Sequence, residues 1–196
     1  MVRSVIGGLV AGLVMFFLGF IFWGTPLSEV AFSKAGDVES AAVQTALAQN
    51  LTPLGTGTYV IPTPSTPQGT ELYGRGPIAM VHFNTGGFAA EDMSMMLPGL
   101  AFALISGLLM AFGIAAVGKE NRFGEVARMV VLFALGITLW TILAQPVFNH
   151  FGWGYWVYLF VSEAVALIAG GLIIARWFVP PPQQQPAEAA GPAAEA

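Results

Sequence analysis

The sequence predicts an all-α membrane protein with four transmembrane helices and a small α+β outer cap between the first and second helices. Of the 196 residues, 56% are hydrophobic and only 9% are charged. A soluble domain carries about 25% charged residues, so this deficit indicates contact with a lipid bilayer. Four long apolar stretches occur, over residues 5–23, 97–117, 129–148 and 156–177. Each is close to the length of about 20 residues that a helix needs to span a membrane.

The first apolar stretch indicates an uncleaved N-terminal anchor over residues 1–23. It follows Arg3 and ends in four bulky residues, Phe-Ile-Phe-Trp, whereas a cleaved signal peptide would end in small residues. Gly8, Gly12 and Gly19 fall on one face of the expected helix, and small residues allow a second helix to approach closely. That face is expected to contact either the other helices of this chain or another subunit.

Residues 24–95 are expected to form the outer cap. A helix is expected at 38–50, where the carboxylate of Asp37 can accept hydrogen bonds from the first turn. Two strands are expected at 58–61 and 78–83, because both stretches have strand composition and are bounded by Gly and Pro. The stretch 63–69 contains two prolines and is expected to be a loop. A region of this size cannot build a large core alone, so we expect it to pack against the membrane helices or against a partner.

The remainder of the chain divides into a membrane unit and a tail. The second, third and fourth apolar stretches are joined by short connections, so residues 96–178 are expected to form a three-helix transmembrane unit. Residues 179–196 contain three consecutive prolines, three glutamines and then mostly Ala, Pro and Glu. This tail has little to bury and is expected to be disordered.

The distribution of basic residues predicts the orientation in the membrane. Only Lys34 and Arg75 lie on the cap side of the expected spans, and five basic residues lie on the other side: Arg3, Lys119, Arg122, Arg128 and Arg176. Basic residues concentrate in cytoplasmic segments. Both termini are therefore expected in the cytoplasm, with the cap on the opposite side of the membrane.

The sequence carries no recognisable catalytic or metal-binding motif. It has no cysteine and no Walker phosphate loop, HExxH zinc pair, GxSxG nucleophile elbow or dinucleotide glycine fingerprint. His82 and His150 have no accompanying ligand residues, so both are interpreted as hydrogen-bonding groups. The net charge of −4 argues against nucleic-acid binding, which needs clustered basic residues. We therefore expect no enzyme activity, no cofactor and no metal site.

Glu163 is the one acidic residue inside an apolar stretch. A charged carboxylate near the centre of the bilayer costs about 2.5 kcal/mol or more. Counting residues from the turn at Phe151 places three hydroxyl groups at a similar depth on other helices, those of Ser106, Thr138 and Thr141. Glu163 is therefore interpreted either as a structural hydrogen-bond partner of one of these hydroxyls or as a proton or ligand site.

A ridge of small residues lies beside Glu163. Ser162, Ala166 and Gly170 are spaced four residues apart, which places them along one face of a helix. Such a ridge is typical of close packing between membrane helices.

The residue pattern also resembles a known group of proteins. The segment Gly57-Thr58-Tyr59-Val60-Ile61-Pro62, the later Gly76-Pro77 before a strand, and a glutamate in the last span at Glu163 are the features in question. They resemble an uncharacterised group of small bacterial inner-membrane proteins with one span, an outer cap and three further spans. The resemblance implies a bacterial inner (plasma) membrane location and a periplasmic cap. It implies no activity and no catalytic residue.

Three functions remain open at this point. The first is a non-enzymatic accessory subunit that makes helix–helix contacts with other membrane-protein subunits, for example in an energy-transducing complex. The second is a small transporter or proton-linked permease that uses Glu163, which would require a cavity around that residue. The third is an enzyme acting on a lipid-soluble substrate, which needs a cluster of acid and base groups that the sequence does not supply.

Overall fold

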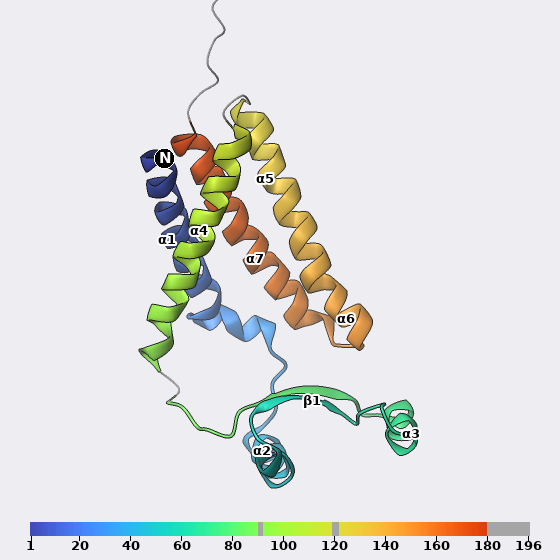
Figure 1. Cartoon of the computed structure of the whole chain (residues 1–196). Coiled ribbons are helices and arrows are strands. Elements are labelled where there is room, and N and C mark those ends of the chain that lie inside the picture. The colour runs from blue at the N-terminus through green and yellow to red at the C-terminus, as the bar shows by residue number, and fades with distance from the viewer. Residues whose placement is uncertain (90–91, 119–121, 180–196) are drawn as a thin grey trace, which may run out of the picture. The chain divides into compact units, whose positions relative to one another are not determined.

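The computed structural model describes residues 1–89, 92–118 and 122–179, and these divide into two compact units (Figure 1). Unit 1 comprises residues 1–33 and the chain from residue 93 onward, and unit 2 comprises residues 34–92. Within the described residues, four helices are long and apolar enough to cross a membrane: Val2–Trp23, Met93–Gly118, Phe123–Asn149 and Trp153–Phe178. The expected class, a multi-pass, predominantly helical membrane protein, is confirmed. The tail expected at 179–196 lies, apart from Val179, outside the described residues.

The first membrane helix, α1 (Val2–Trp23), ends where the chain reaches proline. A short 3-10 helix, η1 (Pro26–Ala31), follows it. In a continuing α-helix the carbonyl of Phe22 would accept from the N–H of residue 26, but proline has no N–H. The hydroxyl of Tyr158 supplies the missing donor at 2.5 Å. Thr25 similarly donates its hydroxyl to the Ile21 carbonyl at 2.7 Å.

The second and third membrane helices are α4 (Met96–Gly118), preceded by η3 (Met93–Met95), and α5 (Phe123–Thr138). Helix α5 starts at Phe123, earlier than the expected residue 129. The side chain of Glu125 accepts a hydrogen bond from the Arg122 N–H at 2.8 Å, which stabilises this earlier start as a capping box. A π-helical turn, η4 (Leu139–Leu143), and α6 (Ala144–Asn149) continue the same membrane crossing. Pro146 lies just beyond that turn and lacks the N–H that a regular helix would use, a common cause of such irregularities.

The last membrane helix is α7 (Trp153–Ile173), extended by the π-helical turn η5 (Ile174–Phe178). The reversal before it is made at His150, which adopts a left-handed conformation with φ 56°. At this end of unit 1 a cluster of aromatic rings joins α1, α7 and the segment after α1. Trp23 lies 5.1 Å from Tyr158 and 5.9 Å from Tyr155, and Phe32 lies 5.6 Å from Tyr155, between ring centroids. These contacts place residues up to Ser33 with the membrane helices, although the sequence led us to assign them to the cap.

We name the two ends of unit 1 by their side chains. The aromatic end carries the ring cluster just described, and the basic end carries Arg3, Arg122, Arg128 and Arg176. At the basic end the Arg3 side chain donates a hydrogen bond to the Trp177 carbonyl at 3.0 Å, which joins the start of α1 to the end of the last crossing.

The four crossings form an open row in the order α4, α1, α7, α5. Helix α1 packs most extensively against α4 and α7, and α7 also packs against α5, whereas α4 makes few contacts with α5 or α7. In Figure 1, α4 and α5 approach each other at the basic end and diverge toward the aromatic end. The buried core follows this arrangement, since its members lie in the halves of the helices near the basic end: Ala11, Ala111, Ile114, Val126, Val130, Ile174 and Ala175.

Unit 2 contains a helix, a hairpin-like sheet and a second helix. Its elements are α2 (Asp37–Leu51), η2 (Thr52–Leu54), β1 (Gly57–Ile61), α3 (Pro67–Arg75) and β2 (Ala79–Phe83). The strands pair antiparallel, with Gly57 opposite Phe83 and Ile61 opposite Ala79. Leu51 and Gly69 are the buried residues among those described in this unit. The expected α+β composition and the lack of a large core are both present.

Two expectations for unit 2 are wrong in detail. Asp37 is the first residue of α2 and not its cap, because Gly36 occupies the capping position and no side chain caps the helix. The stretch expected to be a loop at 63–69 contains the start of α3. There the Thr66 hydroxyl accepts from the Gly69 N–H at 3.0 Å and Pro67 occupies the first helical turn, the positions at which these two residues favour a helix start.

Candidate functional site

The glycines Gly8 and Gly12 of α1 lie directly against the backbone of α4. A Cβ atom added to Gly8 would lie 2.7 Å from the Leu108 Cα atom, and one added to Gly12 would lie 2.6 Å from the Ala103 carbonyl oxygen. Gly107 of α4 faces both glycines, because a Cβ atom there would lie 2.6 Å from the Gly12 nitrogen. The contact surface of these two glycines is therefore occupied by α4 of the same chain.

The other small residues singled out from the sequence have different environments. Gly19 has no neighbouring atom within 4 Å of the position that a Cβ would take, so it is not part of the same contact. The ridge formed by Ser162, Ala166 and Gly170 is buried. Gly170 faces α1, since its added Cβ would lie 2.9 Å from the Met15 sulfur and 3.6 Å from the Ala11 Cβ. This ridge packs α7 against α1.

Two of the three hydroxyl groups expected near Glu163, those of Thr138 and Thr141, bond to their own helices instead, and that of Ser106 has no hydrogen bond to any described residue. The Thr138 hydroxyl, 3% exposed, donates to the Ala134 carbonyl at 2.7 Å. Thr141 donates to the Ile137 carbonyl at 2.7 Å, and Ser162 donates to the Leu159 carbonyl at 2.9 Å. A hydroxyl in an apolar medium is satisfied most directly by the carbonyl one turn earlier. The expected interhelical hydrogen bond from Glu163 to one of these hydroxyls is therefore absent from the described residues.

Glu163 itself lies exposed on α7. It makes no hydrogen bond or ion pair with any residue that the structure describes. Ten residues separate it from Trp153 at the aromatic end, which is about 15 Å along a helix. Glu163 is therefore an intramembrane carboxyl group with no partner in the described part of this chain.

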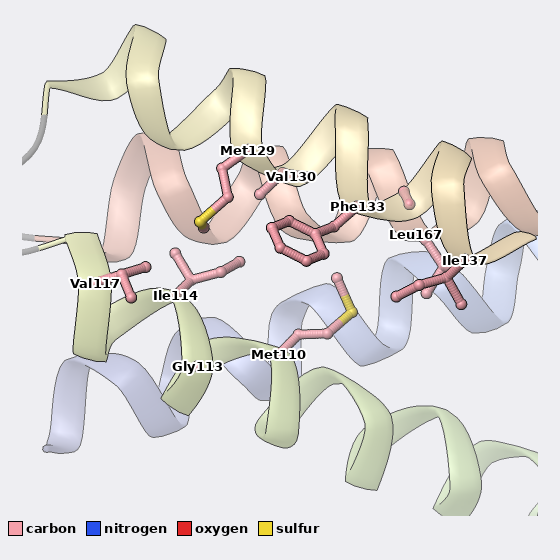
Figure 2. A pocket seen from close by; sticks show the side chains of 10 residues that line it. Met110, Gly113, Ile114, Val117, Met129, Val130, Phe133, Ile137 and Leu167 are labelled. Carbon is pink, nitrogen blue, oxygen red and sulfur yellow. The ribbon is translucent and has the colours of Figure 1, made fainter.

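An apolar cavity lies between α4, α5 and α7 (Figure 2). Its volume is about 430 Å³. Its walls consist of aliphatic, methionine and phenylalanine side chains together with two small residues: Met110, Gly113, Ile114, Val117, Met129, Val130, Phe133, Ala134, Ile137 and Leu167. Figure 2 shows the side chains of Met110, Phe133 and Ile137 extending into the space between the helices. The cavity occupies the place where α4 and α5 begin to separate.

Three polar residues, called the polar rim from here on, lie one helical turn beyond lining residues of this cavity, in the direction of the aromatic end. Glu163 precedes the lining residue Leu167 by four residues, so it lies one helical turn from it on the same face of α7. On the other two helices, Ser106 lies one turn before the lining residue Met110, and Thr141 lies one turn after the lining residue Ile137. Because α4 and α7 run antiparallel to α5, all three polar residues lie at the same end of the cavity.

The remaining candidates for chemistry have local roles. The imidazole of His82 is hydrogen-bonded to the Thr58 hydroxyl at 3.0 Å across the β1–β2 pair, and His150 forms the reversal before α7. Within the described residues, no group of three or more His, Cys, Asp or Glu side chains lies close enough to hold a metal ion.

The polar rim was only partly accessible to sequence reasoning. Depth counting grouped Ser106, Thr138 and Thr141 with Glu163; none of the four lines the cavity, and Ser106, Thr141 and Glu163 each lie one helical turn from a lining residue. The apolar lining residues Met110, Ile137 and Leu167 were not identified, because nothing in an apolar stretch distinguishes a residue that lines a cavity from one that faces lipid. Only the packing order of the helices makes that distinction.

Comparison with known proteins adds no further constraint: no family model, no curated protein and no solved structure matches this chain.

Proposed function

We propose that this chain is a non-enzymatic accessory subunit of a larger membrane assembly, and that it binds other membrane-protein subunits through the open side between α4 and α5. The observation that carries this proposal is Glu163, an exposed carboxyl group within a membrane span that has no partner among the described residues. Ionisable groups at such positions usually pair with another group or face a water-filled cavity. A partner helix would provide that pairing.

The shape of unit 1 supports the same proposal. The four crossings form an open row and not a closed bundle, so large side chains remain uncovered at the edge of the cavity. Phe133 is 64% exposed and Ile137 is 56% exposed although both line the cavity. A further helix placed between α4 and α5 would cover these side chains and close the bundle.

We further propose a bacterial inner membrane location, with both termini in the cytoplasm and unit 2 in the periplasm. This orientation is supported by the basic residues at the basic end and follows from their preference for the cytoplasmic side.

Cross-linking in native membranes tests the accessory-subunit proposal. The chain has no cysteine, so Ile137→Cys creates a single reactive site at the edge of the cavity. Val161→Cys is the matched control, because Val161 is also exposed and lies two residues from Glu163, about 200° around α7. A photo-activated thiol reagent should link the Ile137 variant, but not the Val161 variant, to a second protein of defined mass that co-migrates with the chain in mild detergent. Equal linking from both positions, or migration of the native protein as an isolated monomer, would contradict the proposal.

A second function, a small proton-linked permease, is favoured by one observation, the position of Glu163 one helical turn from the cavity-lining residue Leu167. It predicts that proteoliposomes containing only this protein catalyse proton-coupled flux that Glu163→Gln abolishes. An accessory subunit predicts no flux from the isolated protein.

A further inference from the structure

The chemistry of the cavity and its rim indicates what kind of helix would occupy it. We propose that the partner is a transmembrane helix carrying one basic side chain, Lys or Arg, at the depth of Glu163. This inference rests on the proposed function, since it names the chemistry of the partner that the accessory subunit would bind.

No countercharge for Glu163 is present within the spans that the structure describes. The basic residues of the membrane helices lie at the basic end, and the nearest one on the same helix, Arg176, follows Glu163 by thirteen residues, or about 20 Å. No described basic side chain lies at the depth of Glu163 in the other three crossings. A countercharge for an ionised Glu163 would therefore come from another molecule.

The hydrogen-bonding groups of the polar rim also favour a basic partner. An ionised Glu163 offers only hydrogen-bond acceptors. The Thr141 hydroxyl donates its proton to the Ile137 carbonyl, and its oxygen lone pairs can still accept a hydrogen bond. Ser106 makes no hydrogen bond to any described residue, so its oxygen can also accept. Lys and Arg side chains carry donors and no acceptors. They match the acceptors of Glu163 and Thr141.

The rest of the occupant must be apolar. Below the rim, every lining side chain of the cavity is apolar, so the occupant must present an apolar surface along that length. Met110 and Met129 line opposite walls, and methionine adapts its shape to irregular partners. A helix that is apolar except for one basic residue satisfies both parts of the site.

A second copy of this chain does not meet these requirements. Its membrane helices would bring no basic group to the depth of Glu163, and a symmetric contact through this face would place one Glu163 carboxyl group near the other. Like charges at close range in an apolar medium repel strongly.

The experiment uses the full-length protein in liposomes and three synthetic helices of about 24 residues. The helices are built from Leu and Ala and differ only at the central position, which is Lys, Gln or Leu. The protein carries a donor dye at Val147→Cys, an exposed position outside the cavity lining, and each helix carries an acceptor dye. Association is measured by energy transfer as a function of the helix-to-lipid ratio.

We expect the Lys helix to associate about tenfold more tightly than the Leu helix, the scale of a polar contact between membrane helices. The Gln helix should fall between them. In Glu163→Gln protein, checked for unchanged thermal stability, the preference for Lys should disappear while weak binding of all three helices remains. A Lys helix that binds no better than the Leu helix, or a preference that survives Glu163→Gln, would overturn the inference.

Two further outcomes separate this inference from the proposed function. If the Ile137→Cys cross-link forms in native membranes but the Lys helix shows no preference, the subunit role stands and the basic partner is wrong. Dodecylammonium, a small lipophilic cation, is added as a competitor of the Lys helix. If the amine displaces the helix and binds the protein at least as tightly as the helix does, the site takes a small lipophilic cation. That result would overturn the helix as occupant.

Discussion

The hydroxyl group of Tyr158 donates a hydrogen bond to the carbonyl of Phe22 at 2.5 Å, joining α7 to the end of α1. This carbonyl lacks its usual donor because Pro26 has no N–H. The ring of Tyr158 also lies 5.9 Å from the ring of Phe22 and 5.1 Å from that of Trp23. The Phe22 carbonyl, which Pro26 leaves without a backbone donor, is thus satisfied by a side chain of α7, a helix distant in sequence.

Replacement of Tyr158 by Phe should lower the stability of the protein. The ring contacts are retained, but the Phe22 carbonyl loses its donor, which costs about 1–3 kcal/mol for a buried unsatisfied group. For a chain of this size that corresponds to a fall in Tm of several degrees, measured by thermal unfolding in detergent. Tyr155→Phe is the control, because its ring belongs to the same cluster and no described residue is hydrogen-bonded to its hydroxyl. Equal Tm values for the two variants would show that the Tyr158 bond is unimportant.

Replacement of Gly12 by Leu should disrupt the packing of this chain itself. Overpacking costs about 1–3 kcal/mol where neighbours can move, and here the neighbouring atoms belong to the α4 backbone. We expect reduced accumulation in the membrane and a lower Tm. Gly19→Leu introduces the same side chain on the same helix where nothing lies within 4 Å, and it should leave both quantities unchanged. A Gly12→Leu protein as stable as the Gly19→Leu control would contradict the close α1–α4 contact.

These glycines illustrate how far sequence reasoning reaches. Four crossings follow from the length and apolarity of the stretches, and the spacing of Gly8 and Gly12 correctly indicates close helix approach. The partner of that approach could not be predicted, because α4 is separated from α1 by unit 2 and nothing local records which helices meet. Residue spacing alone also included Gly19, which the structure leaves out of the contact. Helix α3 was missed because Pro67 suggested a loop, although after Thr66 it favours the first turn of a helix.

The orientation of the chain is tested by reporter fusions. A reporter that is active only in the cytoplasm should function when it is inserted between Gly118 and Arg122 or fused after Gln185, and it should fail when it is inserted at Thr66. The physical reason is the preference of basic residues for the cytoplasmic side. Activity of the Thr66 fusion would reverse the orientation.

Glu163 provides the test that separates a role inside this chain from a role between chains. Because Glu163 is exposed and has no hydrogen-bonding partner among the described residues, Glu163→Leu should not destabilise the isolated protein in detergent. In a membrane the substitution removes a cost of about 2.5–3.5 kcal/mol for placing a charge at this depth, so accumulation should be equal or higher. Thr138→Val is the comparison, since Thr138 is buried and its hydroxyl is bonded to the Ala134 carbonyl.

The same Glu163→Leu substitution should have the opposite effect on assembly. When it is combined with Ile137→Cys in native membranes, the cross-link to the second protein should weaken or disappear, because the partner loses its acceptor while the cavity keeps its shape. Glu163→Gln, which retains a polar acceptor, should accumulate normally and give an intermediate yield of cross-link. A Glu163→Leu protein that is unstable in isolation would instead indicate that the carboxyl group holds this chain together. A stable Glu163→Leu protein that cross-links as well as the parent would show that Glu163 contributes neither to the fold nor to assembly.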